Sequence, residues 1–524
     1  MKVVTADEMR AIDGRAQEEF GVRADDLMSE AGRAVAREII ERYQPCPVTV
    51  VCGGGNNAGD GFVVARALSE FGFTVWAALL SDPSKLRGSA SRAFDALSGV
   101  GVPVVGPADL PAHLAESVLA VDAILGTGVR GPARGVMAEA ITAVNECPAE
   151  VVSIDIPSGL RELGPGEDPG PVVEAGVTVT IGLPKVALLT MPGWLFTGEM
   201  IVAPINFPAE LLEDPAIRLN FAPDSVLRGW LPPRAADSNK GSFGRVGVVA
   251  GSPECAGAAI LAARAALRTG AGLVTIFTTA ELNPVYKTAV PEAVTAIVPA
   301  DGSGRLGAES LAAVLERAHG MDVLALGPGI GAGDSQAALV RGVLAGFAGA
   351  VVVDADAVTC LAGPACGTAA LKRQAATVLT PHPGEMARLA GATVAEVQSD
   401  RIGCARRFAG EHAVTLLLKG ACTVVAQPDG QVWLNPGATS ALAKGGTGDV
   451  LTGMVAGMLA QGAPLPHAAL LAAQVHLSAG MSLAEKGNAR SVMAGDLIDE
   501  IPHALSALEA DAGAATPPPE EEQE

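Results

Sequence analysis

Residues 441–459 read ALAKGGTGDVLTGMVAGML, and the four residues GGTG at 445–448 stand directly before a long apolar run. This pattern predicts a tight loop that enters a buried helix beginning near Asp449. Consecutive main-chain N–H groups and the helix dipole form an anion hole at such a junction. Asp449 falls in the first helical turn, where its carboxylate can accept a proton from a hydroxyl group that attacks phosphorus. Plain capping is the alternative role for Asp449, but a cap requires no GGTG before it.

Short apolar runs, each followed by turn residues and a helical Ala-rich stretch, recur along the rest of the chain. They lie at 48–52, 73–79, 119–125 and 151–154, and again at 246–250, 273–277, 323–326, 350–353, 376–379 and 414–418. Continuous rather than alternating apolar strands are typical of parallel sheets that helices cover on both faces. We therefore predict an α/β protein with an N-terminal Rossmann-like three-layer αβα domain and a second α/β domain. A hairpin at 424–434 is expected to turn at Asp429-Gly430.

The composition between the two series of strands suggests where the chain divides. We expect one domain over 1–212, a junction rich in Pro and acidic residues over 213–232, a second domain over 233–510, and a solvated acidic tail over 511–524. Residues 450–484 carry no formal charge, but Gly462 and Pro464 interrupt them. Each half is too short to span a bilayer of ~30 Å, so we predict two buried helices.

Charge and cysteine content exclude several classes of function. The chain of 524 residues has 36 Lys and Arg against 57 Asp and Glu, a net charge of −21, which disfavours binding to nucleic acid or to an anionic membrane surface. Its eight cysteines are scattered without C-x-x-C spacing, which predicts reduced thiols and no zinc site or disulfide framework. The first residues, MKVVTADEMRAID, leave no room for the apolar core of a signal peptide, so we expect a cytoplasmic protein.

The first candidate site is CGGGNNAGDG, which follows the predicted strand at 48–52. Ligands of open α/β sheets bind at the carboxyl ends of strands, where helix N-termini attract anions. The loop is neither a dinucleotide G-x-G-x-x-G nor a P-loop, and a structural turn is the alternative explanation of its glycines. The amide oxygens of Asn56 and Asn57 and the carboxylate of Asp60 can bind a hard cation or sugar hydroxyls.

Two further strand ends of the first domain carry carboxylates. Asp122 lies inside the apolar run at 119–125, and Asp155 closes the run at 151–154, with Ser158 after it. A buried carboxylate requires a partner, which is a shared ligand pocket in one interpretation and a cap of its own loop in the other. Three strands of one sheet that end in Asp and Gly favour the pocket.

In the second domain two strand ends attract attention. His382 stands between two prolines in LTPHPGE, and Lys419 follows directly after the run VTLLL. Lys419 is placed to meet a nucleotide phosphate, with a snorkelling side chain as the alternative. A surface histidine is the alternative interpretation of His382. Small residues at the loop 324–331 and at the start of the helix expected near Gly257 allow a ligand to approach the main chain closely.

Taken together, these segments resemble a known family. GGGNNAGDG, VDAILGTGVRG and SIDIPSG resemble the NAD(P)H-hydrate epimerases, whereas KGSFG, GPGIG, TPHPGE, LKG and KGGTGDVLTG resemble the NAD(P)H-hydrate dehydratases, which have a ribokinase-like fold. Both parts in this order resemble the bifunctional NAD(P)H-hydrate repair enzymes. The chain departs from the family pattern at Arg23, Ser29 and Glu30, in the segment 204–208, and at Asn239.

The resemblance implies a repair activity on NADH and NADPH that have become hydrated at ring carbon 6. The epimerase part interconverts the R and S hydrates, and the dehydratase part removes water from the S form with ADP in prokaryotic members and ATP in eukaryotic ones. The hydrates NADHX and NADPHX and the co-substrate ADP are the implied partners, potassium and magnesium the implied ions, and a homo-oligomer the implied assembly. Nucleic acid and membranes are not expected as partners.

The resemblance also implies residue roles, and these are carried over position by position. Potassium is expected at Asn57, Asp122 and Ser158, and ADP at Lys419, Gly420, Ala421, Cys422, Thr423 and Gly448. The hydrate of the second domain is expected at Ala258, Gly329, His382 and Asp449. The hydrate of the first domain is expected at Asn56, Asn57, Ala58, Gly59, Asp60, Gly126, Thr127, Gly128, Val129, Arg130, Gly131, Pro132 and Asp155.

Our hypothesis assigns catalysis to Asp449 in the second domain and to Asp155 in the first. Asp449 would deprotonate the C6 hydroxyl for attack on ADP, and Asp155 would act as acid and base for loss and return of that hydroxyl. Two alternatives remain: a ribokinase-like small-molecule kinase with an N-terminal nucleotide-binding regulatory domain, and a first domain that only binds or scaffolds.

Overall fold

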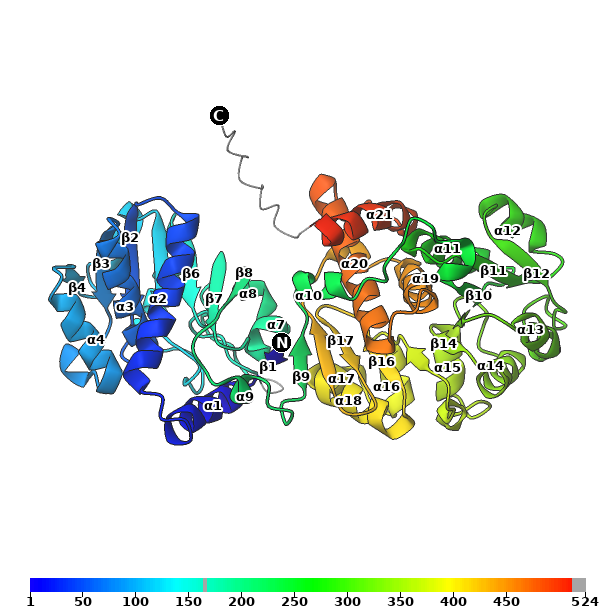
Figure 1. The fold of residues 1–524 in the computed structure, drawn as a ribbon, viewed down its shortest axis with the longest axis horizontal. Coiled ribbons are helices and arrows are strands. Elements are labelled where there is room, and N and C mark those ends of the chain that lie inside the picture. The colour runs from blue at the N-terminus through cyan, green and yellow to red at the C-terminus, as the bar shows by residue number, and fades with distance from the viewer. Residues whose placement is uncertain (164–166, 511–524) are drawn as a thin grey trace, which may run out of the picture. The chain divides into compact units, whose positions relative to one another are not determined.

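The apolar runs of the first 220 residues form one parallel sheet with the strand order β4-β3-β2-β5-β6-β7-β8 (Figure 1). The computed structural model describes residues 1–163 and 167–510, so the predicted tail at 511–524 lies outside the described residues. The chain divides into two compact units between Asn220 and Phe221, inside the stretch 213–232 expected to be the junction. Each unit is described by itself.

In the first unit, helices cover both faces of the sheet. The strands are β2 (Pro47–Cys52), β3 (Thr74–Leu79), β4 (Val104–Val105), β5 (Leu119–Ala123), β6 (Glu150–Ile154), β7 (Val177–Ile181) and β8 (Glu199–Ala203). Successive side chains of a strand point to opposite faces, so Val50 packs against one helical layer and Val51 against the other. The helices are α2 (Ala24–Arg42), α3 (Asn56–Glu70) and α4 (Gly88–Ser98) on one face, and α5 (Leu110–Glu116) and α6 (Val136–Glu146) on the other.

The N-terminal segment closes over one end of this unit. β1 (Lys2–Val3) pairs antiparallel with β9 (Leu219–Phe221), and Val4 forms a parallel bridge to Lys185. α1 (Ala6–Glu18) follows, with a capping box between Thr5 and Glu8. The unit is completed by α7 (Val186–Leu189), α8 (Trp194–Thr197) and α9 (Ala209–Leu212). The bridge and the capped helix fix Asp13 and Lys185 near the carboxyl ends of the strands.

Two boundaries in the first unit differ from the sequence predictions. The helix after β2 was expected near Gly61 but begins at Asn56, because Gly55 serves as N-cap and the helix starts directly after the glycine turn. The strand expected over 119–125 ends at Ala123, because the N–H of Ile124 donates to the Asp122 carboxylate and turns the chain. β7 and β8 were not predicted.

The second unit contains a mixed sheet with the order β18-β17-β16-β15-β14-β13-β10-β11-β12. From β16 to β12 neighbouring strands are parallel, and the antiparallel β17 and β18 form the predicted hairpin. The strands are β10 (Arg245–Val249), β11 (Leu273–Thr278), β12 (Val294–Ile297), β13 (Val323–Leu326), β14 (Ala350–Val353), β15 (Thr377–Leu379), β16 (Thr415–Leu418), β17 (Thr423–Ala426) and β18 (Val432–Asn435).

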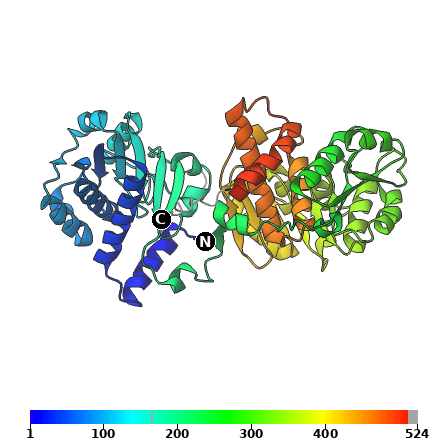
Figure 2. The same ribbon diagram turned by 45° about the horizontal axis from the view of Figure 1, so that its top comes forward.

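Helices again cover both faces of the sheet (Figure 2). One face packs against α11 (Ala256–Thr269), α19 (Thr447–Ala460), α20 (Leu465–Lys486) and α21 (Ala494–Ala510). The predicted pair of buried helices in 450–484 is thus confirmed as α19 and α20, although α19 begins at Thr447 rather than near Asp449. The remaining helices are α10 (Asp224–Gly229), α12 (Asn283–Ala289), α13 (Leu311–Arg317), α14 (Asp334–Gly346), α15 (Asp356–Ala362), α16 (Pro383–Ala390), α17 (Val394–Ser399) and α18 (Arg401–His412).

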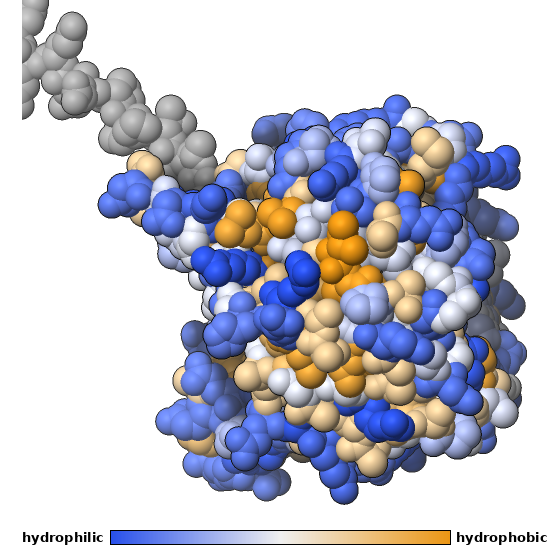
Figure 3. All heavy atoms as spheres, turned by 90° about the vertical axis from the view of Figure 1, so that its right-hand side faces the viewer, coloured by the Kyte–Doolittle hydropathy of each residue, from blue (hydrophilic) through white to orange (hydrophobic). Residues whose placement is uncertain are grey.

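The edge strand β12 leaves apolar side chains in contact with solvent. Val294 and Ile297 of β12 and Val285 of α12 are among the exposed large hydrophobic residues, and Figure 3 shows apolar side chains gathered on this face. No helix in residues 1–163 and 167–510 is both long enough and apolar enough to cross a membrane.

Candidate active sites

A cavity of about 740 Å³ lies at the carboxyl ends of the strands of the first unit. It collects most of the residues predicted for the first site: Asn56, Asn57, Asp60, Gly126, Thr127, Gly128, Val129 and Asp155. Arg130 and Gly131 line a second cavity of about 510 Å³ that shares several walls with the first. Ala58 and Gly59 do not line the cavities, since Ala58 is fully buried in the core and Gly59 packs against Met28. Pro132 packs against Gly170.

Asp155 is held rigidly at the end of β6. Its main chain adopts a positive φ of 68°, which is rare for a residue other than glycine and which marks a local strain at a functional position. The carboxylate accepts a hydrogen bond from the N–H of Ile181 (3.1 Å) and forms an ion pair with Lys185. Lys185 is 1% exposed and also donates to the carbonyl of Ile181 (2.8 Å). Asp155 therefore faces the cavity as a carboxylate with a fixed orientation.

Two further carboxyl groups share this cavity with Asp155. The pKa of Asp13 is raised to about 6, mainly by burial and also by the nearby negative charge of Asp155, while Lys185 acts in the opposite direction. Burial also raises the pKa of Asp60 well above its usual range, again with Asp155 and Asp13 adding to the effect. Like charges in a poorly hydrated cavity cannot all ionise, so the cluster retains protons near neutral pH.

A buried polar cluster, which we call the oxygen knot, lies beneath the cavity and consists of Asp122, Asn57 and Ser158. The Asp122 carboxylate accepts bonds from the N–H groups of Ile124 (3.2 Å) and Ser158 (2.8 Å) and from the hydroxyls of Ser153 (2.8 Å) and Ser158 (2.5 Å). The Asn57 amide donates to the carbonyl of Leu125 (3.1 Å), which lies 3.0 Å from the Ser158 hydroxyl oxygen. Burial raises the pKa of Asp122, although its hydrogen bonds act in the opposite direction. The three predicted potassium ligands are therefore neighbours, and Asp122 also ties together its own loops.

In the second unit a cavity of about 600 Å³ lies beside the GGTG turn. Of the six residues predicted for nucleotide binding it is lined by five: Lys419, Gly420, Ala421, Thr423 and Gly448. Cys422 is the exception: its N–H donates to the carbonyl of Gly437 (2.9 Å), and its side chain is buried. His382, predicted for the hydrate, lines the same cavity.

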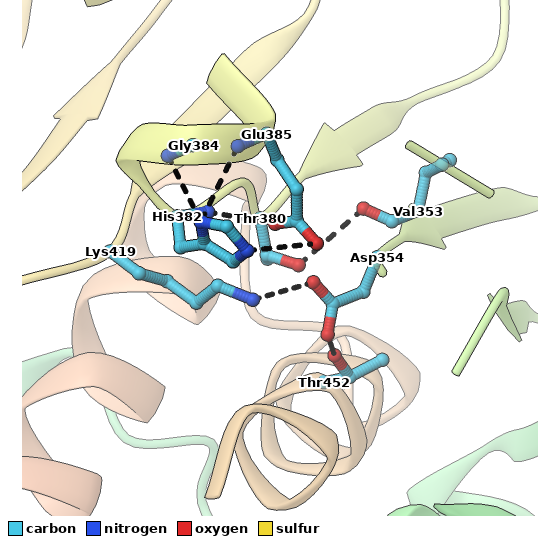
Figure 4. A network of polar contacts seen from close by, with 8 residues as sticks. All are labelled: Val353, Asp354, Thr380, His382, Gly384, Glu385, Lys419 and Thr452. Carbon is cyan, nitrogen blue, oxygen red and sulfur yellow. Dashed lines mark hydrogen bonds and ion pairs between the residues drawn. The ribbon is translucent and has the colours of Figure 1, made fainter. Parts of the chain in front are cut away.

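Lys419 stands at the centre of a polar network at the ends of β14, β15 and β16 (Figure 4). Its ammonium group donates to Asp354 Oδ1 (2.6 Å), and the other carboxylate oxygen of Asp354 accepts from the Thr452 hydroxyl of α19 (2.6 Å). Burial lowers the pKa of Lys419, but the charges of Asp354 and Glu385 outweigh it, so its pKa is raised. The lysine thus stays charged although its side chain is only 18% exposed.

Lys419 approaches Gly448 closely, so a side chain at position 448 would crowd the ammonium group. A Cβ atom at this position would lie 3.3 Å from Lys419 Nζ and 3.8 Å from Asp354 Oδ2. Gly446, the N-cap of α19, has a φ of 92° that favours glycine. The first N–H groups of α19 have no partner within the helix, so the turn presents main-chain donors beside a buried ammonium group.

Asp449 lies in the first turn of α19, as predicted. Burial raises its pKa to about 6, with the charge of Asp354 and, more weakly, Asp356 acting in the same direction and that of Lys419 in the opposite one. Among the described residues none forms a hydrogen bond or ion pair with its carboxylate, and the N-cap of the helix is Gly446. Asp449 is therefore not occupied in capping and is available to a ligand.

The residues predicted for the hydrated ring converge on the same end of the sheet. A Cβ on Gly329, which follows β13, would lie 3.0 Å from the Cβ of Ala258 in the first turn of α11. The N–H of Gly331 donates to Asp356 (2.8 Å), whose charge also acts on Asp449. Ala258, Gly329 and Asp449 thus come from three elements that meet at one edge.

His382 has a structural role that its sequence pattern did not predict. It is the N-cap of α16, where its Nδ1 accepts hydrogen bonds from the N–H groups of Gly384 (3.0 Å) and Glu385 (3.3 Å). The neutral ring therefore carries its proton on Nε2, which can donate. Its side chain is 53% exposed and lines the cavity.

Sequence reasoning missed four residues of these clusters: Asp13, Lys185, Asp354 and Glu385. Asp354 directly follows the predicted strand at 350–353, the same signal that identified Asp155, and it could have been found in that way. Glu385 lies inside the quoted TPHPGE, where its position after a proline indicates a first-turn helix residue. Asp13 and Lys185 carry no comparable local signal, because only the tertiary fold brings them to the cavity.

Comparison with known proteins gives matches to both units. The family profile described as NAD(P)H-hydrate dehydratase matches residues 246–503, and the one described as YjeF-related protein N-terminus matches residues 24–187. The bifunctional NAD(P)H-hydrate repair enzyme Nnr of Moorella thermoacetica is 40% identical over 520 residues, which cover 97% of this chain and 97% of the relative. The enzyme of the same name from Escherichia coli is 34% identical over 95% of this chain and 92% of its own length.

Solved structures give a partial match. The ADP/ATP-dependent NAD(P)H-hydrate dehydratase from Bacillus subtilis, co-crystallised with ATP and Mg²⁺, is 34% identical, covers 55% of this chain and 98% of its own, and superposes with a TM-score of 0.48. The full-length identity to the curated relatives, together with the two profiles, decides the assignment. This chain belongs to the bifunctional NAD(P)H-hydrate repair enzymes.

Proposed function

We propose that this chain repairs hydrated NADH and NADPH in two steps, with the first unit interconverting the R and S hydrates and the second dehydrating the S form with ADP. The proposal for the second unit is carried by one observation: Asp449, whose pKa is raised to about 6, has no bonded partner among the described residues and stands beside Gly448 and Lys419. A base with a pKa near the working pH is suited to proton transfer.

The dehydration then proceeds through phosphoryl transfer. Asp449 accepts the proton of the C6 hydroxyl, and the hydroxyl oxygen attacks the terminal phosphorus of ADP, so that the bond to AMP breaks. The N–H groups at the start of α19 and the ammonium group of Lys419 stabilise the charge on the transferred oxygens.

The second stage is an elimination. The phosphorylated C6 oxygen leaves as orthophosphate, driven by the lone pair of the ring nitrogen, and a proton lost from C5 restores the ring double bond. The sum of the two stages converts hydrate and ADP to NAD(P)H, AMP and phosphate. Phosphorylation is needed because hydroxide is a poor leaving group.

The network around Lys419 fits a magnesium ion bound with the nucleotide. Asp354 and Glu385 are both buried and share the single ammonium group of Lys419, and burial raises the pKa of Glu385. These two carboxylates would hold the ion, which would neutralise charge on the phosphate oxygens. Oxygen ligands of this kind are the ones that Mg²⁺ prefers.

In the first unit the reaction is loss and return of the C6 hydroxyl. A protonated carboxyl group gives its proton to the leaving oxygen, the ring nitrogen forms an iminium ion, and water then adds to either face with loss of a proton to a carboxylate. We assign the fixed carboxylate of Asp155 as the base, and Asp13, with its raised pKa, as the group that holds the proton.

The oxygen knot beneath this cavity fits potassium. The carboxylate of Asp122, the hydroxyl of Ser158 and the carbonyl of Leu125 are connected by contacts of 3.0 Å or less, and the amide nitrogen of Asn57 donates to the same carbonyl (3.1 Å), which brings its amide oxygen close to them. These oxygen atoms would hold the ion, which would balance the charge of Asp122 and fix the loops that line the cavity. Hard oxygen ligands suit a hard cation.

The test is to supply purified S hydrate with ADP or ATP in parallel and to follow both the absorbance of reduced nicotinamide and free orthophosphate. We expect equal amounts of recovered NAD(P)H and phosphate. A small-molecule kinase would instead accumulate a stable phosphorylated product without recovered absorbance, and that result would contradict the proposal. Supplying R hydrate tests the first unit, because its consumption should exceed the spontaneous rate.

A further inference from the structure

The residues discussed above account for only one end of the substrate. Ala258, Gly329, His382 and Asp449 surround the hydrated ring, but a nicotinamide dinucleotide continues from the ring through ribose and a doubly charged pyrophosphate to a terminal adenosine. This inference rests on the proposed function, since it asks where that tail is bound in the second unit. The tail requires a cation beside the ring site and a further cavity beyond it.

Arg305 is a cation at the border of the ring site. A Cβ on Gly331, in the loop that carries Gly329, would lie 2.7 Å from Arg305 Nη1. The carboxylate of Asp356 contacts the same loop, and its charge acts on both Arg305 and Asp449. The guanidinium group therefore lies one loop away from the proposed base.

The present partner of Arg305 can be exchanged. Its Nη2 forms an ion pair with Glu254 Oε1 (3.0 Å), but Glu254 is 62% exposed, and such pairs contribute little. The Nε of Arg305 is buried and has no hydrogen-bond partner among the described residues. A guanidinium group with a free donor and a weak partner is suited to two oxygens of a pyrophosphate.

A cavity of about 560 Å³ is lined by Gly304, the residue that precedes Arg305 in the chain. Its lining also includes Thr279 and Glu281 after β11 and Ile297 and Pro299 at the end of β12. Thr279 is 3% exposed, and its hydroxyl oxygen has no hydrogen-bond partner in residues 1–163 and 167–510. A buried hydroxyl without a partner is costly, so it indicates a ligand that supplies one.

The walls of this cavity suit a nucleoside. Ile297 is 45% exposed, so it offers an apolar surface on which a base can pack. The cavity is large enough for a small ligand, and its mostly apolar lining carries the unpaired Thr279 hydroxyl and the Glu281 carboxylate as polar groups. The turn 252–255 connects it with Ala258, because Pro253 lies 3.8 Å from where a Cβ of Gly304 would stand.

We propose that Arg305 binds the pyrophosphate of the hydrated dinucleotide and that the cavity of Thr279, Ile297, Pro299 and Gly304 holds its terminal adenosine. The ring then lies at Ala258 and Gly329, and the tail crosses the turn at Glu254. Glu254 is displaced from Arg305 when the substrate binds.

The experiment compares substrates with and without the tail. Arg305→Gln and wild type are assayed with ADP on the S hydrate of NADH and on the S hydrate of reduced nicotinamide riboside, which lacks both phosphates and adenosine. We expect kcat/KM of Arg305→Gln to fall about 10- to 100-fold on the dinucleotide, the range for a lost charged hydrogen bond. On the riboside it should change by less than about twofold, and KM for ADP should stay constant.

Two matched variants sharpen the result. Glu254→Gln removes the competing partner of Arg305, so kcat/KM on the dinucleotide should stay the same or rise. If the ion pair were purely structural, Glu254→Gln and Arg305→Gln would both lower kcat/KM. Thr279→Val should raise KM for the dinucleotide about three- to tenfold and leave the riboside unaffected. The hydrates of NADH and NADPH should be affected by the same factor in Arg305→Gln.

Several outcomes would overturn the inference. For Arg305→Gln these are an equal loss of kcat/KM on both substrates, no loss of kcat/KM on the dinucleotide, or a raised KM for ADP. A loss of kcat/KM confined to the NADPH hydrate would also overturn it, because Arg305 would then contact the 2′-phosphate. Wild-type turnover of the NADH hydrate is the internal reference. If wild type restores no NADH, the proposed function itself fails, and that result is distinct from a failure of the tail site.

Discussion

The two units solve a similar electrostatic problem with similar groups but different surroundings. In the first unit three carboxyl groups surround Lys185, and in the second Asp354, Glu385 and Asp449 surround Lys419. Both clusters lie at the carboxyl ends of parallel strands, where buried charges of opposite sign compensate one another. The two clusters differ in the groups that lie next to the lysine.

Lys185 has both its strand carbonyl and the Asp155 carboxylate as partners and is enclosed, whereas Lys419 lies against Gly448 and the first N–H groups of α19. Epimerisation moves protons and water, so it needs carboxyl groups at different stages of ionisation and no anion hole. Phosphoryl transfer builds charge on phosphate oxygens and therefore needs main-chain donors and a positive charge beside them. The same residue types thus support two chemistries because one cluster includes a glycine turn.

Apart from replacement of Asp449, the largest expected effect concerns the base of the first unit. Asp155→Asn should lower the rate of epimerisation about 10²- to 10⁴-fold, the range for general acid–base catalysis, and leave dehydration of the S hydrate unchanged. The exposed Asp26→Asn on α2 is the matched control and should leave both rates intact. Measuring both activities on each variant is sufficient, and a parallel loss of dehydration would refute the separation of the two sites.

Lys419→Met tests the second cluster. Loss of the ammonium group should reduce dehydration about 10²- to 10³-fold, because charge on the transferred phosphate loses its stabilisation. Steady-state assays with S hydrate and ADP measure the effect, and epimerisation should persist. Lys372→Met, at an exposed position, is the control. Because the variant leaves Asp354 unpaired, thermal melting should accompany the assay, and Lys419→Arg should keep the fold and recover part of the rate.

The rates of the two reactions should change with pH in opposite directions. Asp449 must be ionised, and its pKa is raised to about 6 by burial, so kcat/KM of dehydration should fall about tenfold per pH unit below that value. Asp13 must be protonated, and its pKa is also raised to about 6 by burial, so epimerisation should decline as the pH rises above that value. Parallel pH profiles on one preparation check this, and two limbs of the same sign would contradict the assignment.

The smallest effect is on stability. Because the folded state raises the pKa of Asp449 to about 6, it binds a proton more tightly than the unfolded state, and stability is lost as the pH rises from about 4 to about 6. Asp449→Asn removes this cost and should raise Tm by about 2 °C near neutral pH, which corresponds to about 1 kcal/mol. Calorimetry near pH 7.5 and near pH 4 tests it, and the difference should vanish at the acid end.

Much of this arrangement could be predicted from the sequence, because its signals are local. Apolar runs gave the central strands, and carboxylates at their ends identified Asp122 and Asp155. The position of Lys419 after β16 and that of Asp449 in the first turn of α19 followed from the same reasoning. These features depend on neighbouring residues, so no tertiary information was needed.

The remainder depends on contacts between distant segments. Asp13 lies in an amphipathic helix, where an acidic residue is normally solvated, and only the packing of α1 brings it to the cavity. Lys185 follows β7, a strand that was not predicted, and is positioned by the bridge to Val4. Two departures from the family pattern also meet: Glu30 accepts from the N–H of Asn206 (3.0 Å) and from its amide (2.5 Å). These two departures thus lie in direct contact.

The central claim is that the carboxylate of Asp449 activates the C6 hydroxyl for phosphoryl transfer. The most direct measurement follows both activities of Asp449→Asn, supplied first with R hydrate and then with S hydrate and ADP. The account predicts epimerisation at the wild-type rate and no release of orthophosphate or recovery of NAD(P)H absorbance above background. Dehydration at an undiminished rate in this variant would contradict it.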